Sequence, residues 1–362
     1  MNIRQFRKQV ISKALTKEAA KRLQKEAYEN KEWYTIRSLL GHHDTNWFVL
    51  IGARELGKTF SVQDYVLSCF FNPKHPLYHV PFYWMRLSDA ALNSMKQNNG
   101  AKMFEPLLVE KYGLEEIKVR GDSVFLGELL LCRVYSLSTA YNQKGSAVFN
   151  AKTFKGVNII VDEIAYEKGQ PKRVSVDYNL KMQIENICRH ERKNVKIFIM
   201  MNNTEDCPEV LTSCFGFIPI EFGRYKLKRK HCVIDYIPNN KAYEKRRKTA
   251  LANEIDKGTG NFTNKVVRDI ALIYKGRLCK PSYVIKFSKD SQQDWYTVWD
   301  SNIISAYNGE KVKSIAMKRY IDDVFVPELR DSVIEQEDVR AYRYKSLLVQ
   351  STFRKNLELI KK

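Results

Sequence analysis

Residues 52–59 carry side-chain and backbone types that can bind a phosphate chain. They read Gly-Ala-Arg-Glu-Leu-Gly-Lys-Thr and fit the pattern G-x-x-x-x-G-K-[ST] throughout. The two glycines let the backbone wrap a phosphate, and amides at the start of a helix attract its negative charge. Lys58 would reach the β- and γ-phosphates, and the Thr59 hydroxyl would ligate Mg²⁺. We therefore expect a site for ATP and Mg²⁺ that includes Gly52, Ala53, Arg54, Glu55, Leu56, Gly57, Lys58 and Thr59.

A pair of acids about a hundred residues downstream supplies the complementary chemistry. The apolar run 159–161 ends in Asp162 and Glu163. Asp162 could hold the Mg²⁺ through water, and Glu163 could polarise the attacking water as general base. The adjacent glutamate, and the absence of an N-K-x-D motif that reads guanine, separate this sequence from small GTPases. The pair indicates an ATPase of the helicase and translocase type.

Other side chains are candidates for sensing the γ-phosphate. Asn202 or Asn203 follows the apolar run 195–201, where an amide could contact that group. Arg189 and Arg192 end a predicted helix; they could answer the helix dipole or act as catalytic arginines on a neighbouring subunit's nucleotide. Arg54 and Arg86 are alternative phosphate contacts.

The elements that must position these residues alternate between strands and helices. The pattern predicts strands at 47–51, 82–85, 124–126, 129–131, 134–137, 159–161 and 195–201, and helices after residue 59 and over 178–191. Continuous apolar runs are typical of buried parallel strands. The fold expected is an α/β P-loop NTPase of the additional-strand catalytic-glutamate type, a parallel sheet with helices on both faces.

The chain is longer than one core usually organises, so we expect two domains, with an extension before the first and a linker between them. Residues 1–45 form a helical extension, with a charged helix over 12–40; 46–225 form the ATPase domain, 226–261 a basic linker and 262–362 a smaller α+β domain. Strands are expected at 283–287, 295–299 and 303–307, as in an antiparallel meander, followed by helical sequence.

The formal charge of +20 favours a polyanionic partner such as nucleic acid. Lys152, Lys155 and the basic clusters within 224–248 could grip DNA phosphates without reading sequence. No apolar stretch is long enough for a membrane helix. Seven scattered cysteines without a C-x-x-C suit reduced thiols in the cytoplasm. Prolines argue against a helical metal site at His75 and His79.

The last domain offers acids, but no spacing makes them converge as two-metal nuclease chemistry requires. They are Asp269, Asp290, Asp294, Asp300, Asp322 and Asp323. We therefore expect no active nuclease there. The aromatic pairs Trp295/Trp299 and Tyr296/Tyr307 are expected in the sheet core rather than on a base-stacking surface.

These residues together resemble a known family. The segment 48–59 looks like the phosphate loop of the DNA-encapsidation ATPases of short-tailed phages with protein-primed genomes, and 159–163 and 189–203 resemble that family's next motifs in order and spacing. The segment 135–138 with Lys144 is also similar. The resemblance covers 46–205 and is thinner after 240, at 244–249 and 288–291. Glu55 departs from it, because an acid is tolerable in a phosphate loop only if its side chain points away, and so do the first forty residues.

The resemblance implies a homo-oligomeric, pentameric ring at the portal vertex of a procapsid, a structural RNA partner and a C-terminal domain like a degenerate RNase H-type nuclease. The function expected is an ATP-driven motor that moves double-stranded DNA into a viral procapsid, in the host cytoplasm. Two alternatives stay open: another translocase or helicase of the same ATPase class, and a non-catalytic nucleic-acid-binding scaffold. The scaffold would not need Lys58, Thr59, Asp162 and Glu163 together.

Overall fold

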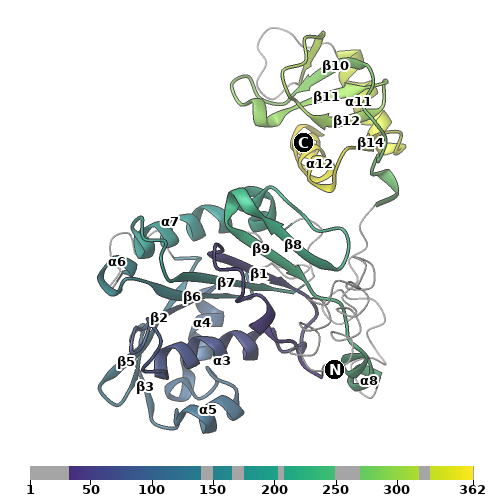
Figure 1. Ribbon diagram of the computed structural model, residues 1–362. Helices are drawn as coiled ribbons and strands as arrows, with labels where there is room; N and C mark the ends of the chain where they lie inside the picture. Colours follow the sequence, from purple (N-terminus) through teal and green to yellow (C-terminus); the bar gives the residue numbers. More distant parts are fainter. Residues whose placement is uncertain are drawn as a thin grey trace, which may run out of the picture. The chain divides into compact units, whose positions relative to one another are not determined.

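The computed structural model describes residues 32–139, 150–164, 175–202, 208–248, 270–317 and 327–361 (Figure 1). The chain divides into two compact units. One is made of Met1–Val210 and Glu221–Val266, and the other of Leu211–Ile220 and Val267–Lys362.

In the described part of the first unit, nine strands form one sheet in the order β3-β4-β5-β2-β6-β7-β1-β9-β8. The strands are β1 Trp47–Ile51, β2 Phe82–Arg86, β3 Ile117–Arg120, β4 Ser123–Leu126, β5 Leu129–Ser136, β6 Val157–Asp162, β7 Val195–Met201, β8 Gly223–Leu227 and β9 Cys232–Tyr236. The six neighbouring strands β5, β2, β6, β7, β1 and β9 are parallel to one another. At one edge of the sheet β4 pairs antiparallel with β5 and with β3, and at the other edge β8 pairs antiparallel with β9. The predicted parallel sheet is confirmed. One strand, β7, separates β1 from β6.

Helices lie on both faces of this sheet, as predicted: Figure 1 shows α3, α4 and α5 on one face and α7 on the other. The described helical elements of this unit are η1 Ile36–Ser38, α3 Lys58–Phe71, α4 Asp89–Gly100, α5 Pro106–Tyr112, α6 Ala151–Phe154, α7 Val176–Cys188, η4 Lys228–Lys230 and α8 Lys241–Lys248. The π-helix η3 Val210–Phe215 belongs to the second unit except for its first residue. In α7 the buried Val176, Leu180, Ile184 and Ile187 form one apolar stripe, because helical residues three or four apart share a face. In the sheet, Phe48 stacks on Phe198 with ring centroids 5.3 Å apart.

In the second unit, the described strands form a five-stranded sheet in the order β13-β10-β11-β12-β14. Its elements are η5 Ile270–Leu272, β10 Pro281–Lys286, η6 Gln292–Asp294, β11 Trp295–Trp299, β12 Ile303–Ala306, β13 Ser314–Ala316, α11 Pro327–Asp338, β14 Arg343–Tyr344 and α12 Leu347–Lys361. Strands β10, β11 and β12 are the predicted meander, while β13 and β14 run parallel to their neighbours. Phe353 of α12 packs edge-on against Tyr296 in the core.

Two predictions about the ends of the first unit are wrong. Residues 12–31 of the predicted N-terminal helix lie outside the described residues, but residues 32–40 form an extended segment and the short helix η1. Tyr34, Ile36 and Leu39 are buried in the main core, so tertiary packing overrides the helical spacing. The expected linker 226–261 begins too early, because β8 and β9 pair as a hairpin at the sheet edge.

Smaller differences concern strand and helix bounds. Helix α7 ends at Cys188, because Arg189 and His190 have left-handed φ values of 43° and 71°. The strands predicted at 129–131 and 134–137 are one strand, β5, and β3 was not predicted. The described cysteines are free. Among the described helices, none has the length and apolar character needed to cross a bilayer.

Candidate functional site

The loop between β1 and α3 occupies the carboxyl end of the parallel sheet. Gly57 has a left-handed φ of 91°, which favours glycine, and a Cβ on Gly52 would come within 2.9 Å of the Leu56 Cδ1 atom and 3.2 Å of the Ile237 Cβ atom. The Gly52 amide donates to the Met201 carbonyl at 3.3 Å, which fixes the start of the loop to the end of β7. Helix α3 begins at Lys58, so its first amides face the space above the loop.

Lys58 is buried, with 6% of its surface exposed. Its Nζ donates to the carbonyl oxygens of Gly52 at 2.8 Å and Ala53 at 2.6 Å, and to Asn202 Oδ1 at 3.4 Å. Burial lowers the pKa of Lys58 to about 7, although Asp162 acts in the opposite direction. The ammonium is therefore held by neutral oxygens in a place where its charge is costly.

The two acids lie where β6 ends. Asp162 is 4% exposed, and burial raises its pKa, while the Arg86 guanidinium partly offsets this. Glu163 has a left-handed φ of 52° and a side chain that is 50% exposed. Arg86, the last residue of β2, donates to Glu163 Oε2 and lies 3.4 Å from Asp162 Oδ2. A single arginine thus holds both carboxylates.

The remaining residues predicted for the loop lie around the same space. Arg54 and Thr59 line it, and the charge of Arg54 helps to lower the pKa of Lys58. The Glu55 side chain is 64% exposed, and its Oε2 lies 4.0 Å from Arg247 Nη1 of α8. The acid in the loop therefore has a cation from another element beside it. Asn203 lies outside the described residues.

A cavity of about 900 Å³ joins these groups. It is lined by the loop, the first residues of α3, both acids and Asn202, and also by Trp33, Tyr34, Thr35, Arg37 and Ser38. The sequence reasoning missed this segment. The available signal was an aromatic pair, Trp33-Tyr34, upstream of the first buried strand, but no spacing rule connects such a pair to the loop.

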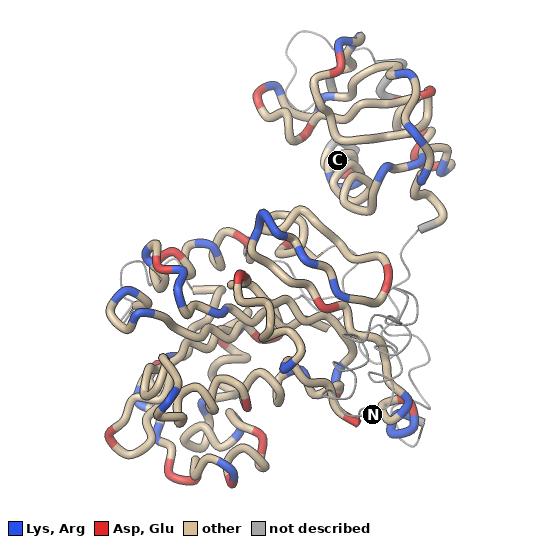
Figure 2. Tube along the Cα trace, in the orientation of Figure 1, with Lys and Arg blue, Asp and Glu red and all other residues tan. Residues whose placement is uncertain are grey.

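Four of the predicted cationic residues lie near the amino ends of β6 and β7, on the side of the sheet opposite the loop. Lys152 lies in α6 and Lys155 follows it, while Arg189 and Arg192 follow α7; all four are exposed. The Asn194 Nδ2 donates to the Lys155 carbonyl at 3.2 Å, which joins the two turns. Figure 2 shows Lys and Arg positions at the ends of α6 and α7, and also along β8. The structure therefore does not bring Arg189 and Arg192 to the loop of their own chain.

In the second unit, Asp294 accepts from Asn356 Nδ2 at 3.1 Å, and Asp300 accepts from the Lys280 amide at 3.4 Å. Across the described ranges, no three His, Cys, Asp or Glu side chains are grouped to hold a metal. Asp269, Asp322 and Asp323 lie outside the described residues.

The comparisons with known proteins agree on one kind of protein. A family model described as Podovirus DNA encapsidation protein (Gp16) matches residues 29–361. The solved structure titled the bacteriophage Phi-29 viral genome packaging motor assembly is 16% identical, with a TM-score of 0.61, over 91% of this chain and 100% of that chain. The Phi-28 gp11 DNA packaging motor is 15% identical, with a TM-score of 0.57, over 90% and 98%. No curated protein matches. At these identities the structural likeness establishes the fold.

Proposed function

The chain belongs to the Podovirus DNA encapsidation protein (Gp16) family, whose function is DNA encapsidation, and from this premise we propose that it drives encapsidation by hydrolysing ATP. The proposed site of hydrolysis is the one around Lys58. The observation that carries the ATPase proposal is the buried Lys58 ammonium, which faces the same cavity as Asp162 and Glu163. The strand order supports it, because β7 separates β1 from β6 as in P-loop ATPases of the additional-strand catalytic-glutamate type.

The residues fit a triphosphate. A buried cation whose partners are neutral carbonyl oxygens gains most from an anion that replaces them. In the proposed complex the loop amides and the start of α3 surround the phosphates, and Lys58 contacts the β- and γ-phosphates. Asn202, next to Lys58 Nζ, senses the γ-phosphate. Arg54 gives a further positive charge along the wall.

The donor set also fits Mg²⁺, which prefers oxygen ligands and commonly takes one carboxylate besides the phosphates. Thr59 and Asp162 are the residues that would hold it, and both line the cavity. When bound, the ion would neutralise charge on the phosphates.

Glu163 is the proposed general base. Its side chain is half exposed within the cavity wall, so a water molecule can reach its carboxylate. Arg86 is a positioning residue, because its guanidinium donates to Glu163 and lies beside Asp162. This bond fixes the direction in which the Glu163 carboxylate points.

The exposed cationic residues near the amino ends of β6 and β7 lie away from the loop, so their proposed roles require a second molecule. In a homo-oligomeric ring, Arg189 or Arg192 would reach the nucleotide of the neighbouring subunit, while Lys152 and Lys155 would contact the phosphates of double-stranded DNA. Membership of this family, together with the two motor structures of the same fold, supports a ring, proposed as pentameric, at the portal vertex of a procapsid in the host cytoplasm. A structural RNA is a further proposed partner.

The second unit is proposed to have a degenerate RNase H-like fold without nuclease activity. A three-stranded meander with β13 parallel to its first strand supports the fold.

The test is ATP hydrolysis by the purified protein, with and without duplex DNA. Turnover that DNA stimulates and that Lys58→Ala abolishes would support the proposal. Glu163→Gln should bind ATP without hydrolysing it, and normal turnover by this variant would contradict the assignment of the base. DNA binding without any turnover, in the presence of portal and procapsid, would favour a non-catalytic scaffold.

A further inference from the structure

The cavity is lined not only by the phosphate loop and the acids but also by residues that have no role in the proposed hydrolysis. The acids lie at the end of β6, two strands from β1 on one side. The cavity is also lined by Trp33, Tyr34, Thr35, Arg37 and Ser38. Tyr34 of this segment is bonded to Asp235 of β9, the neighbour of β1 on its other side. With the γ-phosphate near the acids, the side of β1 that faces residues 33–38 is open to the base and sugar of the nucleotide.

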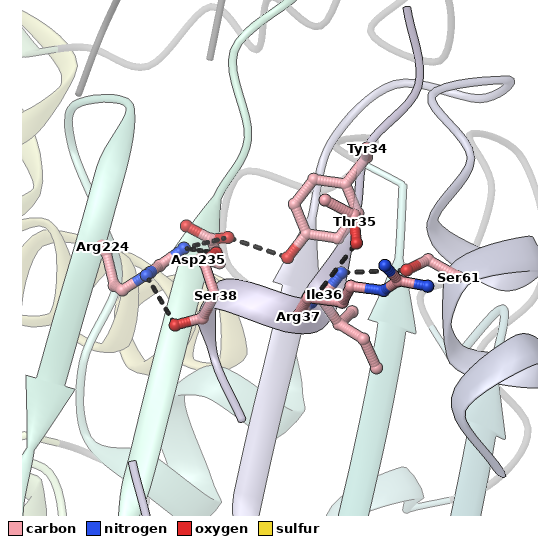
Figure 3. A network of polar contacts seen from close by, with 8 residues as sticks. All are labelled: Tyr34, Thr35, Ile36, Arg37, Ser38, Ser61, Arg224 and Asp235. Carbon is pink, nitrogen blue, oxygen red and sulfur yellow. Dashed lines mark hydrogen bonds and ion pairs between the residues drawn. The ribbon is translucent and has the colours of Figure 1, made fainter. Parts of the chain in front are cut away.

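This segment is held in place by contacts to several elements, as Figure 3 shows. The Tyr34 hydroxyl donates to Asp235 Oδ2 of β9 at 2.8 Å, and Arg224 of β8 donates to the same carboxylate oxygen at 3.3 Å and to Ser38 Oγ at 2.9 Å. The Ile36 amide donates to Ser61 Oγ of α3 at 2.9 Å. A wall fixed to two strands and a helix is ordered before any ligand binds, which lowers the entropic cost of binding.

The segment is also fixed to the phosphate loop. The Tyr34 amide donates to the Leu56 carbonyl at 2.9 Å. A Cβ on Gly57 would lie 3.4 Å from Trp33 Cε3, so the indole lies next to the loop backbone. The Arg246 guanidinium of α8 lies 3.8 Å from the centroid of the Trp33 ring and donates to the Glu32 carbonyl at 3.3 Å. The Trp33 ring therefore has a defined place beside the loop.

Two side chains on this wall offer the chemistry that a planar base requires. Trp33 is 48% exposed although it lines the cavity, and Arg37 is exposed there as well. The Arg246 guanidinium already covers one face of the indole, so a base would contact the other face or the edge of the Trp33 ring. A guanidinium such as that of Arg37 binds the face of a ring or the oxygens of a sugar.

We propose that residues 33–38 form the nucleobase and ribose subsite, in which Trp33 and Arg37 contact the nucleoside part of a nucleoside triphosphate. This inference rests on the proposed nucleotide site at Lys58. It assigns the substrate's nucleoside to a segment outside the phosphate-binding motif. It also explains why an aromatic residue stands beside Gly57.

The experiment compares binding of ATP with binding of inorganic tripolyphosphate, which lacks base and sugar, to the full-length protein by calorimetry. Arg37→Ala and Trp33→Ala should each weaken ATP by about tenfold, an effect of about 1.4 kcal/mol, and leave tripolyphosphate unchanged. Lys58→Ala should weaken both ligands. Arg120→Ala, which removes an exposed arginine from β3, is the matched control and should change neither.

A second measurement guards against loss of packing in the Trp33 variant. ATP, but not tripolyphosphate, should change the emission of Trp33, measured as the difference between wild type and Trp33→Phe. ATP affinity that is unaffected by Arg37→Ala and Trp33→Ala, or equal losses for both ligands, would overturn the subsite while the phosphate site stands. Wild-type protein that binds neither ligand, or binds both regardless of Lys58, would overturn the nucleotide site and the subsite together.

Discussion

The lowered pKa of Lys58 predicts that nucleotide binding depends on pH in a definite direction. In the free protein this pKa is about 7, so at pH 8 about nine-tenths of the side chains are neutral. Bound phosphates favour the charged ammonium, and binding above pH 7 must therefore take up a proton. The affinity for MgATP should fall by roughly tenfold for each pH unit between 7.5 and 9.

Calorimetry tests this prediction directly. Titrations at pH 8 in two buffers with different ionisation enthalpies should report uptake of about 0.9 proton per nucleotide. Lys58→Arg is the control, because a guanidinium stays charged throughout this range and its nucleotide affinity should be nearly independent of pH. A wild-type dissociation constant that is constant from pH 7.5 to 9, with no proton uptake, would refute the reasoning.

Three further outcomes are expected. Arg86→Ala should lower ATP turnover by about tenfold or more in steady-state assays, because both acids lose their shared cation; unchanged turnover would contradict its positioning role. Tyr34→Phe should lower the free energy of unfolding by about 1–2 kcal/mol in denaturant titrations, since a buried bond to a carboxylate is lost. The exposed Tyr78→Phe is its control and should be neutral. Adding Arg189→Ala or Arg192→Ala subunits to wild-type rings should reduce turnover more than dilution does only for the residue that acts in trans, and proportional loss for both would exclude that role.

The parallel core of the first unit could be predicted because its strands have a distinctive composition. Strands β1, β6 and β7 are buried on both faces and therefore appear as continuous apolar runs. Glycines and a lysine that follow such a run further locate the loop. In contrast, β3 has one half-buried face and only four residues, so its pattern was too short to predict.

The contacts that complete the candidate site join positions far apart in the sequence. Tyr34 and Asp235 are 201 residues apart, and neither belongs to a motif. The hairpin of β8 and β9 was placed partly in a linker because its basic residues mask its alternation. Arg86 bonds to acids 76 and 77 residues away only because β2 lies beside β6 in the sheet. Strand order decides such contacts, and local sequence does not encode it.

The pairing of β6 with β7 restricts how a structural change could pass from the carboxyl ends of these strands to their amino ends. Val157 pairs with Val195 and Asp162 with Met200, and the register between them is constant. The two strands therefore connect the exposed cationic residues at their amino ends to the acids at the carboxyl end of β6. Sliding one strand by a residue would turn its buried side chains to the opposite face and break the ladder. Sliding of β6 against β7 would therefore cost the whole ladder of hydrogen bonds between them. A change at the acids that keeps this pairing would move β6 and β7 together, or would act through the loops that join the strands.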